Sequence, residues 1–392
     1  MQFFKNPFYI YAFSFLFIIL IYMLRWSDLY PNLSLWLFIF ILISSIISFV
    51  LGAIIDKYRP IRYKLIDKKI KSLTKTIILI YLLYTLEFIN NKGIPLVLIL
   101  NTDSYDYTNF GIKTLHPILT TFTSFYTVYV FHIILSKKTQ KKTLIIYLIL
   151  LLIIPILIYN RGMFLINLMS FLFVFLMSIK KIKTKIKFYL IISFITILYL
   201  FGVLGNYRMV GNSSNEYFLK VSKAKESFIN SLIPKEFMWA YIYVSSPLGN
   251  LQNTIEKNPA INYRFKDFIF TETLPDFLSK RISILVNAKR VDKINRLTTF
   301  LTVGTVYSRS YILLGWFGVI LMFIIIMLIT FFYIIILPKK SEYYVTGIGI
   351  LCTFMFFNTF TNMIYFSGIS FQLVYPLLFS FINIRPKLKI KI

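Results

Sequence analysis

Charged residues are scarce in this chain, and most of them are basic. They make up 15% of the 392 residues, and 58% of the residues are hydrophobic, whereas a soluble domain carries roughly a quarter charged residues. The single cysteine, Cys352, excludes an internal disulfide and a cysteine metal site. The two histidines, His116 and His132, do not form an HExxH-type zinc motif. This composition excludes an ordinary cytosolic enzyme and a disordered chain, and it fits a polytopic membrane protein.

Long hydrophobic runs occupy most of the chain. A membrane-crossing helix needs about 20 apolar residues, with roughly 17 as a lower limit. Seven runs are clear: 8–24, 33–55, 115–135, 163–179, 188–204, 311–337 and 363–384. Three more are shorter or more polar: 73–89, 144–159 and 343–357. We therefore expect an all-α, polytopic integral membrane protein with about ten transmembrane helices. The run 94–100 follows Gly93 and contains Pro95, and we interpret it as an interfacial or re-entrant piece.

The basic residues predict the orientation of these helices. Apart from Lys5, most of them gather in the connections 57–75, 137–142, 180–187, 339–340 and 385–391. Ten spans put every one of these clusters on one side, which the positive-inside rule assigns to the cytoplasm, with both termini there. The apolar run after Lys5 has no small-residue cleavage site, so we expect a first span rather than a removed signal peptide. The net charge of +28 thus reflects topology, and nucleic acid is not an expected partner.

One long connection lies on the predicted outer side. We divide the chain into a membrane bundle of seven helices (1–204), a large extracytoplasmic loop between helices 7 and 8 (205–310) and three C-terminal membrane helices (311–392). The loop holds fifteen basic and eight acidic residues, and a structureless connection of this length is uncommon unless it is functional. Apolar stretches at 237–244 and 268–274 predict amphipathic helices on the outer membrane surface.

Three arginines stand at predicted outer helix ends with apolar surroundings: Arg161, Arg208 and Arg309. A guanidinium is permanently charged and binds phosphate through two parallel hydrogen bonds, so three converging arginines would suit a pyrophosphate. The alternative is that each side chain extends to the lipid headgroups at a helix end. Lysine dominates the predicted inner side, which favours a shared role for these three arginines.

Four residues are candidates for proton transfer. Glu87 is the only carboxylate inside a predicted span, where ionisable groups are costly and often functional; it suits a general base with a raised pKa or an ion-pair partner. Asp103 and Asp106 are alternative bases, although their neighbours also predict a turn. His116 opens the fourth span and suits an acid or base, or a hydrogen-bonded helix-end histidine.

Aromatic residues near the predicted outer face could stack on sugar rings. The candidates are Tyr207, Trp239, Tyr241, Tyr243 and Tyr307. The alternative is an aromatic belt, which is common where membrane helices meet the headgroup region. We find no glycine-rich phosphate loop, DxD pair or Ser-His-Asp set, so soluble nucleotide-sugar chemistry and ATP-driven transport are not supported.

Several short motifs and the topology together give a family resemblance. The chain resembles the O-antigen polymerase (Wzy-type) family of oligosaccharide repeat-unit polymerases. The resemblance rests on Gly-Ile-Pro-Leu at 93–96, Tyr-Thr-Asn-Phe-Gly-Ile at 107–112, Leu-His at 115–116, Asn-Arg-Gly at 160–162, the segment 241–248 and the segments 305–307 and 314–318. One departure concerns the acidic residue that the family often has before its last Gly-x-x-Gly. Here the equivalent stretch, 311–314, is Tyr-Ile-Leu-Leu, which puts an acid role there in doubt.

The resemblance implies a membrane glycosyltransferase of a bacterial cell (cytoplasmic) membrane. Its substrates would be undecaprenyl-pyrophosphate-linked oligosaccharides, and it would build O-antigen, capsule or exopolysaccharide. The growing glycan would leave its lipid pyrophosphate and join the hydroxyl of an incoming lipid-linked unit on the outer side. Arg161, Arg208 and Arg309 would stabilise the departing pyrophosphate without a metal or other cofactor, with Glu87 or Asp103 as base. Flippase and chain-length regulator proteins are the protein partners that the resemblance implies.

Two other functions remain open from the sequence. An O-antigen ligase shares the architecture of many spans and a large late outer loop, and differs in its acceptor. A polysaccharide flippase or other transporter would belong to a different class. Transporters usually show internal repeats and intramembrane charges, whereas the predicted spans here are almost free of charge apart from Glu87.

Overall fold

Helices are the main secondary structure of the computed structural model. The described residues are 2–101, 105–106, 109–137, 139–179, 184–210, 216–258, 263–291 and 293–384, with the side chains of 2, 184–187, 190–191, 208–210 and 383–384 left out. Within them the only β-pairing is an isolated antiparallel bridge between Ser27 and Ala224. The expected all-α class is therefore confirmed. Asp103, and the side chain of Arg208, lie outside the described residues.

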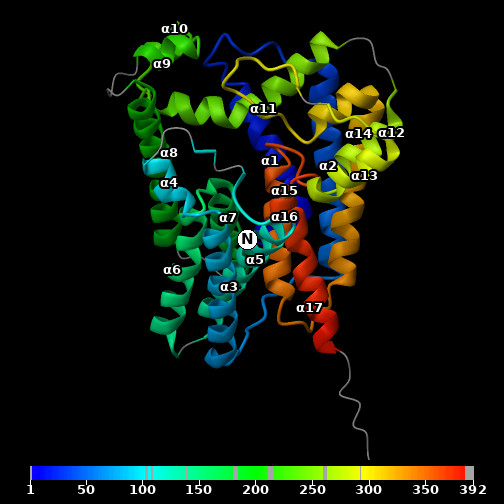
Figure 1. Ribbon diagram of the computed structural model, residues 1–392. Coiled ribbons are helices and arrows are strands. Elements are labelled where there is room, and N and C mark those ends of the chain that lie inside the picture. The colour runs from blue at the N-terminus through cyan, green and yellow to red at the C-terminus, as the bar shows by residue number, and fades with distance from the viewer. Residues whose placement is uncertain are drawn as a thin grey trace, which may run out of the picture.

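The long helices form an elongated bundle (Figure 1). The bundle helices are α1 (Pro7–Tyr22), α2 (Leu35–Tyr58), α3 (Ile70–Asn90), α5 (Leu115–Ser136), α6 (Lys141–Leu157), α7 (Arg161–Ser178), α8 (Thr184–Val210), α14 (Tyr307–Ile336), α15 (Tyr344–Phe357) and α17 (Val374–Ile384). Five segments are long and apolar enough to cross a membrane: 35–58, 70–101, 115–136, 161–178 and 307–336. Several shorter apolar helices accompany them. The chain thus has the character of a helical membrane protein, and ten spans remain a prediction.

Each predicted span overlaps a helix, but several boundaries differ; helix α8, for example, extends beyond the predicted span 188–204 at both ends. The run 363–384 begins as an irregular turn, passes through α16 (Ser367–Ser370) and a short 3₁₀ turn, and becomes α17 only at Val374. In this turn the side-chain oxygen of Asn358 accepts the backbone N–H of Met363, and that of Asn362 accepts the N–H of Ile364. These bonds stabilise the non-helical backbone. The run 94–100 forms the short helix α4 (Pro95–Asn101) directly after α3. Helix α14 begins at Tyr307, four residues before the predicted start.

Polar caps and exposed apolar faces shape the bundle. Asn6, Ser34 and Asn160 each accept a backbone hydrogen bond at the N-terminus of α1, α2 and α7, which satisfies donors that a helix leaves free. The outward faces of α2, α8 and α14 carry many exposed Ile, Leu and Phe side chains. Such faces are stable in lipid, since a soluble monomer rarely exposes large contiguous apolar patches.

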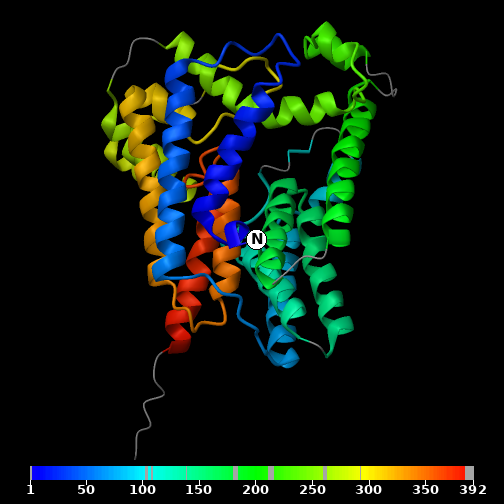
Figure 2. The same cartoon turned by 180° about the vertical axis from the view of Figure 1, so that it is seen from behind.

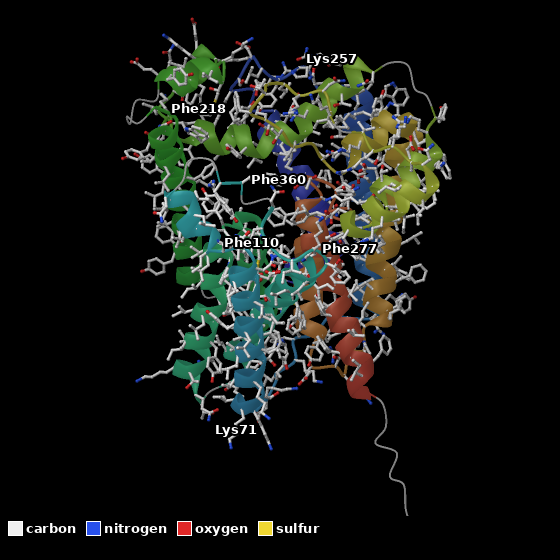
Figure 3. The ribbon with its side chains drawn as sticks, viewed as in Figure 1. Lys71, Phe110, Phe218, Lys257, Phe277 and Phe360 are labelled. Atoms are coloured by element: carbon white, nitrogen blue, oxygen red, sulfur yellow. The ribbon has the colours of Figure 1, made fainter. Side chains whose placement is uncertain are left out.

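The segment between α8 and α14 forms a layer over one end of the bundle (Figures 1 and 2). It contains α9 (Glu216–Val221), α10 (Glu226–Ile229), α11 (Phe237–Lys257), α12 (Phe265–Glu272) and α13 (Asp276–Val286). The predicted apolar stretches 237–244 and 268–274 lie in or overlap α11 and α12. Lys257 lies at this end and Lys71 at the other (Figure 3). We call this segment the outer layer, after its predicted side.

The outer layer has a small hydrophobic core of its own. Phe218 stacks on Trp239 with 3.7 Å between ring centroids, and Trp26 stacks on Phe228 at 4.5 Å. The connection between α1 and α2 completes this core, because Lys225 donates its backbone N–H to the carbonyl of Trp26. Helix α11 packs against α1, α8 and α14. The outer layer is therefore fixed to the bundle.

Candidate active site

A fully buried carboxylate lies in the outer layer. Glu272, the last residue of α12, has no exposed surface. Asn362 donates its side-chain amide to Glu272 Oε2 at 3.0 Å and to the Glu272 carbonyl at 2.7 Å. Arg290 Nε lies 3.6 Å from Oε1, which is an ion-pair distance, and Oε1 has no hydrogen-bond partner among the described residues. Oε1 thus faces a guanidinium but accepts no hydrogen bond within the described residues.

Burial raises the pKa of the Glu272 carboxyl above its usual range. The positive charges of Arg309 and Arg290 and the hydrogen bond from Asn362 act in the opposite direction and offset part of that rise. Removing a carboxylate from water favours its neutral form, whereas nearby guanidinium groups favour the charged form. A carboxylate with a raised pKa is better matched to proton transfer near neutral pH than an exposed one.

The two arginines beside Glu272 are held by different elements. The guanidinium of Arg290 lies over the ring of Tyr365, 3.3 Å from its centroid. Arg309, in the first turn of α14, donates Nε to the carbonyl of Val291 at 3.0 Å. The positive charge around the carboxylate is thus positioned by packing before any ligand arrives, as electrostatic stabilisation of a leaving group requires.

Helix α11 holds the irregular segment 293–306 against this cluster. The side-chain amide of Asn250 donates to the carbonyls of Leu301 and Val303 at 2.8 and 2.6 Å, and its oxygen accepts the N–H of Leu297 at 2.8 Å. A cavity of about 100 Å³ lies between this segment and α14; its lining is Glu272, Ile294, Thr302, Val303, Gly304, Thr305, Val306, Ser308, Arg309, Thr361 and Asn362. It has room for about three water molecules.

Helix α12 contacts α14 beside a kink in α14. Gly315 has φ 60° and ψ −146°, a conformation that is essentially restricted to glycine. Just before the kink, the carbonyl of Leu313 accepts the backbone N–H of Arg264 at 3.0 Å. Asp267 pairs with Arg264 at 2.6 Å and accepts the N–H of Lys289 at 2.8 Å. Helix α12 is therefore fixed both to α14 and to the segment that carries Arg290.

The structure also brings together two of the predicted residues, Glu87 and His116. Glu87 is fully buried near the end of α3, and His116 Nδ1 lies 2.9 Å from its Oε2. Glu87 Oε1 accepts the N–H of Ile112 at 3.3 Å. Gly111 has φ +98°, and a side chain there would meet the His116 ring. Both carboxylate oxygens of Glu87 thus have partners, and neither partner is an arginine.

Helix α13 links the Glu272 cluster to the start of α5. It follows Glu272 in the chain, and Asp276 at its first position donates its backbone N–H to the Tyr365 carbonyl at 2.7 Å. One turn further, Arg281 donates to the hydroxyl of Thr114 at 3.0 Å. Thr114 directly precedes α5, which carries His116. The two buried carboxylates thus lie on elements that α13 joins.

The structure pairs each described arginine of the predicted set with a different neighbour. Arg161 begins α7, is exposed, and lies over the ring of Tyr159 at 4.6 Å while donating to its hydroxyl. Arg309 joins the Glu272 cluster. The side chain of Arg208 and the whole of Asp103 lie outside the described residues, so convergence of the three arginines stays a prediction.

The predicted tyrosines divide into exposed and buried pairs. Tyr207 and Tyr243 are 68% and 40% exposed. Tyr241 and Tyr307 are buried, and the hydroxyl of Tyr307 bonds to that of Tyr11. Of these four tyrosines, only Tyr207 and Tyr243 therefore have exposed rings. Tyr241 and Tyr307 pack the outer layer and α14, which accounts for their positions.

Sequence reasoning missed Glu272, Arg290 and Asn362. A signal for Glu272 was present, because it is a lone carboxylate in the apolar stretch 268–274, as Glu87 is in α3. The roles of Arg290 and Asn362 depend on segments that are far apart in the chain. Within the described residues, no three His, Cys, Asp or Glu side chains form a group that could hold a metal.

An apolar groove runs along the bundle beside α14. It has a volume of about 560 Å³; its lining is Trp36, Ile39, Phe40, Ile43, Ser44, Ile47, Trp316, Ile320 and Phe323, from α2 and α14. Phe40 contacts the rings of both Tyr307 and Trp316. The groove thus reaches the turn of α14 that carries Arg309.

Comparison of the chain with protein-family models, with curated proteins and with solved structures finds no match.

Proposed function

We propose that the chain is a glycosyltransferase that polymerises lipid-linked oligosaccharide units on the outer side of a bacterial cytoplasmic membrane. The product would be a surface polysaccharide, as the resemblance to the Wzy-type family implies. The observation that carries the proposal is the Glu272 cluster: a buried carboxylate, one oxygen of which accepts no hydrogen bond within the described residues, with two fixed arginines and a cavity beside it. It supplies a base and an anion site in one place.

The chemistry needs both of these parts. The acceptor hydroxyl gives its proton to Glu272 Oε1 as its oxygen bonds to the anomeric carbon of the growing glycan. The bond from that carbon to the lipid pyrophosphate breaks, and the pyrophosphate leaves with the electron pair. Arg290 and Arg309 stabilise its charge, which is an interaction that strengthens as the bond breaks. The proton later passes from Glu272 to solvent or to the leaving group.

The surroundings of the cluster suit a lipid-linked substrate. The hydrocarbon chain of the lipid carrier would lie in the groove between α2 and α14, whose upper end meets the turn that carries Arg309. The small cavity would admit only the reacting edge of a sugar. Tyr207 and Tyr243 would contact the more distant sugars through their exposed rings.

The test is a size separation of the surface polysaccharide on a gel. The gene is deleted in its host, and the deletion is complemented with wild type, Arg309→Ala, Arg290→Ala or Arg161→Ala, each checked for expression. The proposal expects single-repeat product without a ladder in the deletion. It also expects loss of the ladder with Arg309→Ala and Arg290→Ala. Loss of the ladder with Arg161→Ala as well would extend the site to α7.

Other outcomes would contradict the proposal. Full-length polymer that is not attached to its final acceptor would favour a ligase. Lipid-linked units that accumulate inside, with none on the outer face, would favour a flippase. A normal ladder in both Glu272-cluster arginine variants would remove the assignment of the active site to that cluster.

A further inference from the structure

A second cavity lies at the end of the bundle away from the outer layer. It has a volume of about 410 Å³, and its lining is Pro60, Arg62, Tyr63, Lys64, Lys339 and Tyr344. The first four residues follow α2, Lys339 lies in the turn between α14 and α15, and Tyr344 begins α15. In Figure 2 the α14–α15 turn lies beside the lower end of α2. We call this cavity the basic pocket.

The positive charge of the basic pocket is not neutralised by its lining. Three of the six lining residues are cationic, and none is acidic. Two nearby carboxylates have other partners: Asp67 pairs with Lys137 at 2.9 Å, and Glu342 pairs with Lys68 at 2.7 Å. Burial and the charges of Arg59 and Arg62 lower the pKa of Lys339. The cations thus repel one another, and a bound anion would relieve that repulsion.

The backbone around the basic pocket is fixed by side-chain hydrogen bonds. Arg59 donates to the carbonyls of Ile334 and Leu337 at the end of α14, at 2.7 and 2.9 Å. The His132 ring bonds to the carbonyl of Lys64 at 2.9 Å. The Lys64 ammonium contacts the Lys340 carbonyl and keeps further donors. The pocket is therefore formed before a ligand binds, which lowers the entropic cost of binding.

A buried hydroxyl gives a second, independent sign of a ligand. Tyr344 lines the basic pocket, is 2% exposed, and its hydroxyl has no hydrogen-bond partner among the described residues. A buried polar group without a partner costs about 1–3 kcal/mol, so a ligand that accepts a hydrogen bond from this hydroxyl would be favoured. Tyr344 is also the first residue of the 14-residue helix α15, whose N-terminus favours negative charge.

We infer that the basic pocket binds a phosphate-bearing anion. Arg62, Lys64 and Lys339 supply the charge, and the hydroxyl of Tyr344 supplies an uncharged donor. A phospholipid headgroup is one source of that phosphate, because the pocket lies between helices whose outer faces are apolar. Free inorganic phosphate is the other source. The inference concerns the opposite end of the molecule from the Glu272 cluster and does not depend on the proposed function.

The experiment is a thermal unfolding series on the purified full chain in a neutral detergent. The probes are phosphatidylglycerol, phosphatidylcholine and inorganic phosphate, each added to saturation. The test variant is Arg62→Gln/Lys64→Gln/Lys339→Gln. The matched control, Lys71→Gln/Lys75→Gln/Lys142→Gln, removes three exposed charges outside the pocket. We expect phosphatidylglycerol or phosphate to raise the unfolding midpoint by about 5 °C in wild type and control, and by much less in the test variant.

The outcomes are separable. A response to phosphatidylglycerol alone identifies a lipid headgroup as ligand, and an equal response to inorganic phosphate identifies a free anion. Equal responses in the test and control variants, or no greater response to phosphatidylglycerol or phosphate than to phosphatidylcholine, would overturn the inference. If the test variant does not fold, Tyr344→Phe serves instead: we expect it to weaken binding about fivefold, and unchanged affinity would contradict the site.

Discussion

The two buried carboxylates, Glu87 and Glu272, differ in how completely their surroundings satisfy them. Glu87 has His116 on one oxygen and the N–H of Ile112 on the other. Glu272 has Asn362 on one oxygen, an arginine at 3.6 Å from the other, and a cavity beside it. Both side chains have no exposed surface, so burial alone does not separate a structural carboxylate from a reactive one.

What separates them is the unused bonding capacity. A buried carboxylate oxygen without a hydrogen bond is costly, and a catalytic role is one explanation for such a group. Glu272 also lies beside two positive charges that could stabilise a leaving anion. In Glu87, by contrast, His116 and a backbone N–H occupy both carboxylate oxygens. Under the proposed function we therefore expect proton transfer at Glu272 and a structural role for Glu87, and the following predictions test that contrast.

The largest expected effect is on Glu272→Gln. The amide keeps the shape of the side chain but cannot act as a base, so we expect polymer formation to fall by about 10²–10⁴-fold. Glu87→Gln should stay within about tenfold of wild type, and Glu226→Gln, on an exposed residue of the outer layer, should not change it. The measurement is the rate of polymer formation in membranes with equal amounts of each variant. A greater loss from Glu87→Gln than from Glu272→Gln would reverse the assignment.

Next in size is the effect of His116→Ala on stability. It leaves Glu87 buried with one backbone donor, and breaking a buried pair on one side costs about 3–5 kcal/mol. The double variant Glu87→Gln/His116→Ala removes the charge as well and should be less destabilised than His116→Ala. Thermal unfolding in detergent measures both. If the double variant is the less stable of the two, the pairing does not account for the position of His116.

The sequence predicted much of the helical framework from hydrophobic runs. It also identified Glu87, because a carboxylate in an apolar run is conspicuous. It did not identify the Glu272 cluster, since that site gathers side chains from α12, the segment that carries Arg290, α14 and the turn after α15. Runs and charge clusters are local signals, whereas the contacts of Arg290 and Asn362 join residues 18 and 90 positions from Glu272.

The segment 314–318 shows a second limit of local reasoning. Its two glycines were part of the family resemblance, but their physical role appears only in the fold. Gly315 makes the kink in α14, and a Cβ at Gly318 would meet the carbonyl oxygen of Ser310 at 2.3 Å. The kink in turn positions α12 through Leu313 and Arg264. A sequence motif can therefore indicate a necessary position without revealing the contact that requires it.

A smaller effect is expected from Gly315→Ala. A side chain is strained at φ 60° and ψ −146°, at a cost of about 1–3 kcal/mol, and the shift would also disturb the contact between Leu313 and Arg264. Gly162→Ala is the matched control, because its Cβ would meet only the side-chain oxygen of Asn160 at 3.6 Å. We expect Gly315→Ala to lower the unfolding midpoint and Gly162→Ala to leave it unchanged. Equal midpoints would show that the kink is not needed.

The smallest effect concerns the pH dependence of polymer formation. The raised pKa of Glu272 places the acid limb of activity above the ordinary titration range of glutamate, because the carboxyl is protonated, and inactive as a base, below that pKa. Arg290→Gln removes a charge that favours the ionised form, so the pKa of Glu272 should rise further and the acid limb should move to higher pH. The profile is normalised to its own maximum, since loss of Arg290 also lowers the rate at every pH.

The control for this shift is Arg264→Gln, whose ion pair is with Asp267 rather than with Glu272. It should lower activity through its contacts to Asp267 and Lys289 and leave the position of the limb unchanged. A limb that moves to lower pH in Arg290→Gln, or that moves equally in both variants, would mean that a group other than Glu272 sets the profile. In that case Glu87, with its histidine partner, would become the stronger candidate for the base.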